Sequence, residues 1–300
     1  MSDRCSHWPV GGSGLAHSEL HTHVGSGLYT ATDLDGPFTR LGHGQCTPFF
    51  ILRQPRRLAI AANYGLWEWQ RDQGHYCQLH DETLTDVLGL AAIPSDPGLV
   101  AATPYGIASA RRDERGAARW TFHSTAPVPD QRYTNALHID PTHPDKWLVG
   151  TEAGVFSYSA RNEHWQPSDL IGTPVRALLA ARGRFWAASD DRGVLQSEDG
   201  LRWERAGDEI TGAIYALHDA GSTLLVATQN GLFFGDGTSP WTRTGPRLVA
   251  TCVTSAPHSP EAWVFGASPG GLWHSRDRGA HWQQIGHFKH VRVVLAPEES

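Results

Sequence analysis

An all-β fold is predicted from three observations: a turn-rich and tryptophan-rich composition, a unit that repeats along the whole chain, and chain ends that fit one sheet. The 300 residues include 32 glycines, 19 prolines and 12 tryptophans but one methionine. Aromatic residues favour strands, while glycine and proline favour the turns between them. With 40% hydrophobic and 19% charged residues, the chain has enough apolar material for a folded core.

Seven glycines mark the repeat, and each is followed by an aromatic residue 10 to 14 positions later. The pairs are Gly27 and Phe38, Gly65 and Tyr76, Gly106 and Trp120, Gly154 and Trp165, Gly193 and Trp203, Gly231 and Trp241, and Gly271 and Trp282. Four short strands, A to D, are predicted in each unit; in the fifth they are 175–180, 184–188, 193–197 and 203–205. Four strands in about 40 residues are typical of a β-propeller blade. We expect the glycine to permit a tight turn before strand C and the aromatic residue to pack between sheets.

The two ends of the chain are predicted to complete one blade. Residues 19–23 and 27–31 have the pattern of strands B and C, and residues 290–295 that of a strand A with nothing after it. Pairing the last strand into the first sheet would remove an exposed sheet edge. We therefore expect a seven-bladed β-propeller in a single domain over 1–300, with 1–18 as a flexible or peripheral segment.

Two segments carry a family resemblance. Residues 275–282 match the Asp-box pattern S-x-D-x-G-x-x-W, and residues 197–203 match a version one residue shorter. The chain resembles the BNR/Asp-box propellers, a group that includes sialidases, sortilin-type domains and Ycf48-type photosystem assembly factors. The resemblance implies that the Asp-box is a structural turn between strands C and D, away from the usual binding face.

Composition argues against several function classes. The formal net charge is −6, which disfavours a general binder of nucleic acid or anionic membranes. The chain has no apolar run long enough to span a membrane and no secretory signal pattern at its start. The four cysteines are widely spaced, which is typical of reduced thiols. We expect a cytoplasmic monomer.

Propellers usually bind ligands where their D–A and B–C loops meet around the axial channel, so candidate site residues are sought there. The candidates for catalysis are His43, His80, Asp86, Tyr133, Arg176, Tyr215, His290 and Arg292. The candidates for ligand binding are Tyr64, Tyr105, His123, Asn135, Glu152, Asp191 and Arg247.

The histidines allow two hypotheses. His43, His80 and His290 lie on D–A connections, where imidazoles could hold a divalent metal such as zinc, copper or iron. The alternative is that they are solvated or hydrogen-bonded loop histidines, because they show no tight ligand spacing.

The arginines also allow two hypotheses. Arg176, Arg247 and Arg292 could hold a carboxylate or phosphate, as the arginines of sialidases do. However, an Arg-Ile-Pro segment is missing and sialidases have six blades, so sialidase activity is disfavoured. The alternative is that the arginines pair with loop carboxylates such as Asp86 or Asp191.

Two function classes remain. The first is a scaffold that binds a protein partner or a small polar or anionic ligand at the channel mouth. The second is an enzyme that acts on such a ligand at the same place. The scaffold is favoured because the sequence shows no known catalytic motif.

Overall fold

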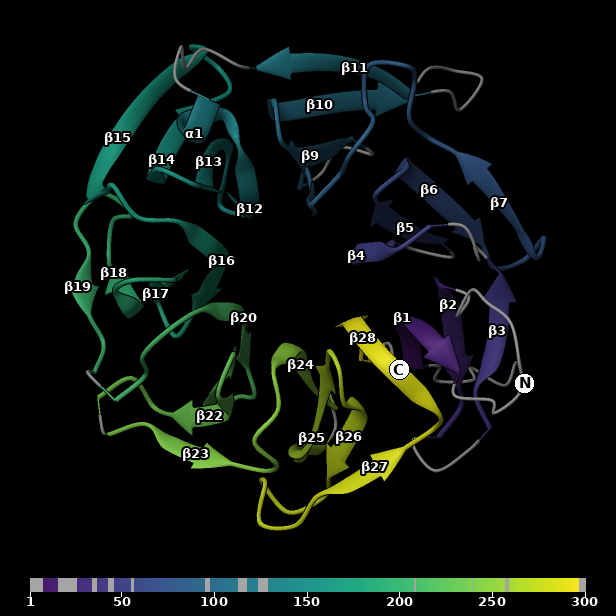
Figure 1. The fold of residues 1–300 in the computed structure, drawn as a ribbon. Coiled ribbons are helices and arrows are strands. Elements are labelled where there is room, and N and C mark those ends of the chain that lie inside the picture. Colours follow the sequence, from purple (N-terminus) through teal and green to yellow (C-terminus); the bar gives the residue numbers. More distant parts are fainter. Residues whose placement is uncertain are drawn as a thin grey trace. The chain divides into compact units, whose positions relative to one another are not determined.

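The computed structural model describes residues 8–15, 26–33, 37–42, 46–54, 57–94, 98–112, 118–123, 129–207, 209–238, 240–256 and 259–296. Apart from one short helix, α1 (Pro129–Arg132), its regular elements are strands (Figure 1). The strands form antiparallel four-stranded sheets, and the chain divides into two compact units. One unit comprises Phe49–Ile214, and the other comprises Met1–Pro48 with Tyr215–Ser300.

The unit of residues 49–214 contains four sheets, each made from four consecutive strands. The first is β4 (Pro48–Gln54), β5 (Arg57–Ala62), β6 (Gly65–Gln70) and β7 (His75–Gln78). The second is β8 (Gly89–Ala92), β9 (Leu99–Thr103), β10 (Gly106–Arg112) and β11 (Ala118–His123). The third is β12 (Thr134–Asp140), β13 (His143–Thr151), β14 (Gly154–Ser159) and β15 (His164–Ile171). The fourth is β16 (Val175–Ala181), β17 (Arg184–Ser189), β18 (Gly193–Ser197) and β19 (Glu204–Arg205).

The unit of residues 1–48 and 215–300 contains three sheets. Two are made from consecutive strands: β20 (Ile214–Asp219), β21 (Leu224–Thr228), β22 (Gly231–Gly235) and β23 (Thr242–Thr244), then β24 (Ala250–Ala256), β25 (Ser259–Ala267), β26 (Gly271–Ser275) and β27 (Gln283–Ile285). The third is composite, in the order β28 (Phe288–Val294), β1 (Trp8–Leu15), β2 (Ser26–Ala31) and β3 (Thr39–Gly42).

The composite sheet corrects the predicted seven-bladed architecture. Six blades are built from four consecutive strands, whereas the composite sheet departs from its prediction in strand B. Its strands A and C, β28 and β2, largely match the predicted residues 290–295 and 27–31. Its strand B is Trp8–Leu15, which was assigned to a flexible segment, while the predicted strand at 19–23 lies outside the described residues. β1 pairs antiparallel with β28, Val10 opposite Val294 and Leu15 opposite Phe288. A glycine-rich segment has low strand propensity by itself, so pairing with the distant β28 decides its conformation.

The hydrophobic core lies between successive sheets. In the unit of residues 49–214, called the larger unit from here on, Leu66 and Leu99 belong to a cluster shared by the first and second sheets. A second cluster joins Ile107 to Trp147, and a third joins Leu148 to Leu195. The other unit is built in the same way, with clusters shared by the β20–β23 and β24–β27 sheets and by the β24–β27 and composite sheets. Each sheet is therefore stabilised by burial against its neighbours rather than by a core of its own.

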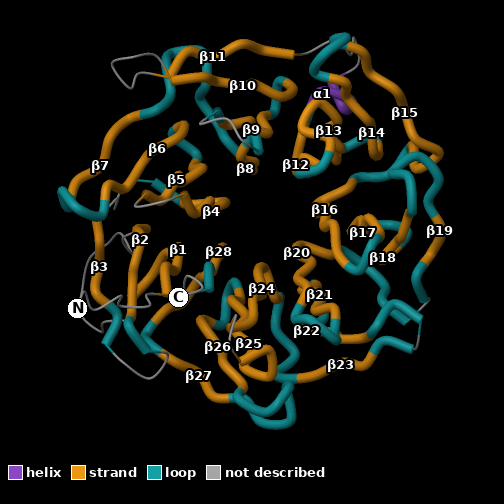
Figure 2. The backbone as a smooth tube through the Cα atoms, turned by 180° about the vertical axis from the view of Figure 1, so that it is seen from behind, coloured by secondary structure: helices purple, strands orange, loops and turns teal. Residues whose placement is uncertain are grey.

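The repeat residues have the predicted roles. Six of the seven repeat glycines adopt positive φ: Gly65, Gly106, Gly154, Gly193, Gly231 and Gly271. The aromatic residues of the repeat, which lie in or next to the fourth strand of their sheet, pack against the clusters between sheets; they are Phe38, Trp120, Trp165, Trp203 and Trp282. In the larger unit, the fourth strands β7, β11, β15 and β19 lie on the outside in both views (Figure 2).

The two Asp-box-like segments form hydrogen-bonded turns. Asp199 accepts the N–H groups of Leu201 and Arg202 at 2.8 and 2.9 Å, and these bonds lower the pKa of its carboxyl. Asp277 accepts the N–H of His281 at 2.9 Å, and its pKa is also lowered. Both aspartates therefore serve the local backbone of their turns.

Candidate functional site

A β-bulge recurs near the start of the first strand of several sheets. The register skips Asn135 in β12, Arg176 in β16, Thr251 in β24 and Arg292 in β28. A bulge redirects the side chain of the extra residue, and bulges often lie next to binding sites. Asn135, Arg176 and Arg292 were predicted as site residues. For Asn135 and Arg176 the bulge explains why the side chain reaches the neighbouring sheet.

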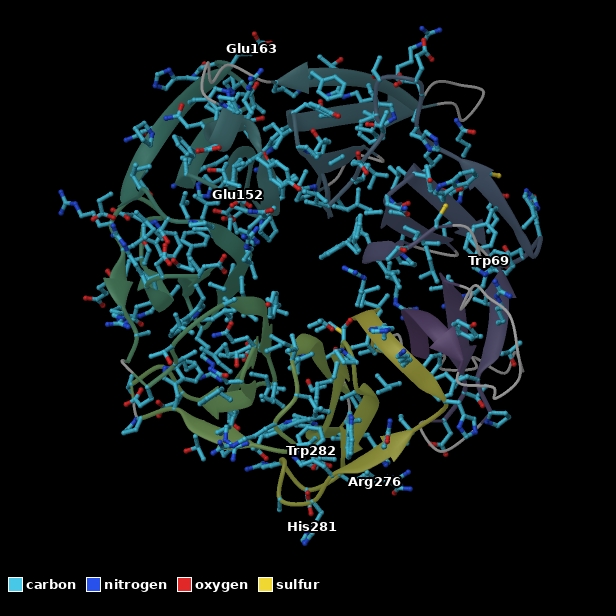
Figure 3. All side chains as sticks on the ribbon, viewed as in Figure 1. Trp69, Glu152, Glu163, Arg276, His281 and Trp282 are labelled. Atoms are coloured by element: carbon cyan, nitrogen blue, oxygen red, sulfur yellow. The ribbon has the colours of Figure 1, made fainter. Side chains whose placement is uncertain are left out.

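Arg176 is the centre of an ion-pair network between the third and fourth sheets. Its Nη1 donates to Glu152 at 2.5 Å, and its Nε and Nη2 donate to Asp190 at 3.0 and 2.9 Å. Asn135 completes the network by donating to Glu152 at 3.0 Å and to the carbonyl of Val175 at 3.2 Å. Burial by itself lowers the pKa of Arg176, but the two carboxylates outweigh burial and raise it. Figure 3 labels Glu152 beside the first strands of these sheets.

This network gives no support to the anion-binding role predicted for Arg176, which stays a prediction. The guanidinium already pairs with two carboxylates of the protein, which would compete with a carboxylate or phosphate ligand. The predicted structural alternative is correct in kind, although the partners are Glu152 and Asp190 rather than Asp86 or Asp191. Asp191 instead accepts a hydrogen bond from Thr173 at 3.4 Å.

We expect Arg176→Met to destabilise the larger unit by about 2 kcal/mol. The substitution leaves two carboxylates, whose side chains are 25% and 22% exposed, facing each other without a cation. Urea unfolding at neutral pH measures the loss. Arg161→Met is the matched control, since Arg161 pairs with Asp145 where both side chains are largely exposed, and there a loss below about 0.5 kcal/mol is expected. Equal effects of the two substitutions would contradict a structural role for the network.

The predicted loop residues of the first sheet gather around a hollow, which we call the acidic hollow. It has a volume of about 580 Å³ and is lined by Asn63, Tyr64, Gln78, His80, Asp81, Glu82, Leu84, Thr85 and Asp86. The lining combines the β5–β6 turn, which is the predicted B–C loop, with the segment that follows β7, which is the predicted D–A loop. It contains three carboxylates and no lysine or arginine. The hollow is therefore electronegative, which favours a cationic or hydrogen-bond-donating ligand over an anion.

His80 forms the wall of the acidic hollow. Its Nδ1 lies 3.2 Å from the N–H and 3.0 Å from the carbonyl of Leu66, and its ring packs edge-on against Trp67. A Cβ on Gly65 would meet the His80 ring at 2.4 Å, so the glycine makes room for the imidazole. With Nδ1 on the backbone, Nε2 is the nitrogen that the described contacts leave for a ligand.

The carboxylates of the acidic hollow differ in what they already bind. Asp81 accepts the N–H and hydroxyl of Thr83 at 2.9 and 2.5 Å, which closes a turn. Among the described residues, no hydrogen bond or ion pair engages the side chains of Glu82 and Asp86. These two groups therefore keep their charge and their acceptor capacity for a ligand.

His123 is not a loop residue but the last residue of β11. Its Nε2 lies 2.8 Å from the hydroxyl of Ser109, and its Nδ1 lies 2.9 Å from the hydroxyl of Tyr158 in the next sheet. Burial lowers the pKa of His123, an effect that Glu163 partly opposes. Its hydrogen bonds therefore link two sheets, which corrects the predicted loop position of His123, while its ligand-binding role stays a prediction.

The remaining predicted residues do not join the acidic hollow. Tyr105 and Tyr133 are exposed on neighbouring sheets of the larger unit. Tyr215, Arg247, His290 and Arg292 belong to the other unit, where Nδ1 of His290 lies 2.9 Å from the hydroxyl of Ser268. Burial, followed by Lys289 and Arg292, lowers the pKa of His290. His43 lies outside the described residues.

Sequence reasoning missed a second hollow at the opposite ends of the strands. It measures about 670 Å³ and lies between the β12–β13 and β16–β17 turns, lined in part by His138, Lys146 and Arg184. Its charged groups already have partners: Asp140 contacts His143 at 3.1 Å, and Arg184 contacts Glu198 at 3.3 Å. The A–B turns have no common pattern in the repeat, so no sequence signal marked this hollow.

The metal hypothesis for His43, His80 and His290 gains no support from the described residues. Within these ranges, no three histidine, cysteine or carboxylate side chains are grouped so that they could hold a metal ion. His80 and His290 also belong to different units. Among the described helices, none has the length and apolarity that crossing a membrane requires.

Comparison with known proteins identifies the fold but no family. No family model and no curated protein matches the chain. The GH74 xyloglucanase from Xanthomonas campestris is similar in structure, with a TM-score of 0.63 and 15% identity over 79% of this chain, which spans only 45% of the xyloglucanase. The Swd1 β-propeller domain from Myceliophteria thermophila has a TM-score of 0.59 and 15% identity, covering 80% of this chain and 90% of that domain. The computationally designed Ika8 protein has a TM-score of 0.61 and 14% identity over 82% of this chain and 76% of its own.

These similarities define the class of protein. The chain is an all-β protein with a β-propeller fold, and its structural neighbours include both a GH74 xyloglucanase and the Swd1 β-propeller domain. At such low identity the neighbours show the fold alone, so function has to be argued from the site. The more specific resemblance to Asp-box propellers stays a prediction.

Proposed function

We propose that this protein is a ligand-binding β-propeller scaffold whose binding site is the acidic hollow. One observation carries the proposal: His80, Asp86 and Tyr64, all predicted from loop position alone, line the same hollow. A pocket with a few convergent polar groups is the usual form of a ligand site. The ligand is polar, and the charge of the lining favours a cation or a hydrogen-bond donor over the anion considered from the sequence.

Catalysis at the same place is the alternative. It would use His80, Glu82 and Asp86 as acid–base groups, in reach of a substrate in the hollow. Binding requires only the charge and shape of the lining, whereas catalysis requires a further group that activates the substrate. Binding is therefore the function that the geometry supports better.

The proposal is tested with spermidine as a cationic probe and citrate as an anionic probe, by titration calorimetry at low ionic strength. We expect spermidine to bind and citrate not to bind. The double substitution Glu82→Gln and Asp86→Asn should weaken spermidine binding about ten-fold or more, because it removes both uncommitted charges.

The matched control removes two charges elsewhere in the same unit, by Glu163→Gln and Glu204→Gln. Both carboxylates are exposed and lie outside the acidic hollow. Similar losses in the two double variants would show that spermidine responds to net charge rather than to the hollow. That result, or binding of citrate, would overturn the proposal.

A further inference from the structure

Exposed tyrosines are concentrated on the same edge of three successive sheets. The exposed large hydrophobic side chains among the described residues are Phe50, Tyr64, Tyr105, Tyr133, Ile171 and Tyr215. Tyr64, Tyr105 and Tyr133 are 62%, 54% and 37% exposed, and all three belong to the larger unit. An exposed ring does not contribute the stabilising free energy that its burial would supply. Exposed aromatic side chains that are grouped on one edge are typical of recognition surfaces.

Local contacts place the three tyrosines on neighbouring turns. Tyr64 lies in the β5–β6 turn at the acidic hollow, and Tyr105 lies in the corresponding β9–β10 turn of the next sheet. Tyr133 follows α1, which contacts both β10 and β13, and its carbonyl accepts the N–H of Glu152 at the turn after β13. The first and second sheets share one core cluster and the second and third share another, so these turns follow one another along one edge.

The turns that carry the rings are fixed by their own hydrogen bonds. Thr103 accepts the N–H of Tyr105 at 3.0 Å and donates to the carbonyl of Gly106 at 2.9 Å. The carbonyl of Tyr64 accepts the indole N–H of Trp67 at 2.7 Å. The N–H of Tyr133 donates to the carbonyl of Pro129 at 3.0 Å. A partner therefore meets rings on an ordered backbone, which lowers the entropy cost of binding.

The charge of this edge indicates the kind of partner. Glu82 and Asp86 lie beside Tyr64 in the hollow, whereas near Tyr133 the charges of Asp130 and Arg132 offset each other, so the negative charge of this edge is concentrated at the hollow. Tyrosine rings attract cations through their faces, and carboxylates attract them by charge. The combination is complementary to lysine or arginine side chains rather than to acidic ones.

We propose that Tyr64, Tyr105 and Tyr133 form a docking surface for a basic segment of a partner protein, one of whose lysine or arginine side chains enters the acidic hollow. The inference rests on the proposed function, because it extends the same hollow along the edge of the sheets. It names the ligand as a protein segment rather than a free small molecule.

The test uses a synthetic peptide of alternating arginine and glycine, with the matching glutamine–glycine peptide as a reference. Titration calorimetry should show binding of the arginine peptide alone. Tyr105→Ala and Tyr133→Ala should each weaken that binding about five-fold, the size of a cation–π contact at an exposed site. Tyr105→Phe keeps the ring and should change the affinity less than two-fold.

Spermidine separates this inference from the proposed function. Tyr105 and Tyr133 lie outside the hollow, so their alanine variants should bind spermidine like the unmodified protein, which also shows that they are folded. If the arginine peptide binds equally well to both alanine variants while spermidine still depends on Glu82 and Asp86, the docking surface is wrong and the hollow stands. Preferential, tyrosine-dependent binding of neutral cellohexaose over the peptide would overturn the basic partner.

Discussion

Replacing Gly154 by alanine is expected to destabilise the unit of residues 49–214 by more than about 3 kcal/mol. Gly154 has a φ of +127°, a conformation that residues with a side chain rarely adopt. A Cβ at this position would lie 2.0 Å from the carbonyl oxygen of Leu170 and 2.9 Å from the Cα of Ile171. Because both neighbours are backbone atoms, the clash cannot be relieved by a side-chain rotation. Urea unfolding followed by tryptophan fluorescence measures the effect.

Gly172→Ala is the matched control for this prediction. Gly172 lies in the same sheet region and also has a positive φ of +79°, but a Cβ there would meet no atom within 4 Å. It should therefore show only the conformational cost of a left-handed alanine, about 1 kcal/mol. If both substitutions cost the same, the backbone contact at Gly154 is not the cause.

Acid is expected to destabilise the unit of residues 1–48 and 215–300 through His218. Burial lowers the pKa of His218 to about 4, an effect that Asp219 partly opposes. Its Nε2 accepts the N–H of Ser255 in the next sheet at 3.0 Å, which requires that nitrogen to be unprotonated. The unfolded state takes up a proton near the ordinary pKa of about 6.5, whereas the folded state does so only near 4. Stability should therefore be constant above about pH 6.5 and fall between pH 6.5 and 4, by at most about 3 kcal/mol.

His218→Gln is expected to remove most of this pH dependence. Glutamine has no titrating group, and its carbonyl can accept the N–H of Ser255. Urea unfolding at pH 7.5 and pH 4.5 compares the variant with the unmodified protein and with His164→Gln, which removes an exposed histidine. An undiminished stability loss between pH 7.5 and 4.5 in His218→Gln would exclude His218 as the cause.

The sequence predicted the elements that each repeat specifies locally. A glycine before strand C and an aromatic residue near strand D recur because every sheet turns at the same point and packs against the next. Gly106 and Gly154 have the positive φ this turn requires, and Trp165 and Trp282 pack against the clusters between sheets. The same periodicity located Tyr64, His80 and Asp86 near one another, because connections of equivalent type lie at the same end of a sheet.

The repeat did not predict features that depend on pairing between distant segments. Strand β1 has a glycine-rich sequence and pairs with β28, about 280 residues away along the chain. The bulges at Asn135 and Arg176 arise from strand register and leave no mark in the residue order. Arg176 pairs with Glu152 and Asp190, partners that its position in the sequence did not indicate.

By itself, then, the sequence determined an all-β chain of repeated four-stranded units and the loop edge on which polar and aromatic side chains gather. Both follow from local preferences for turns, strands and burial that act within about 40 residues. Only the tertiary structure decided which charges neutralise one another and which stay available, because ion pairing depends on distances of a few ångströms between different sheets. That selection leaves Glu82 and Asp86 in an electronegative hollow beside Tyr64.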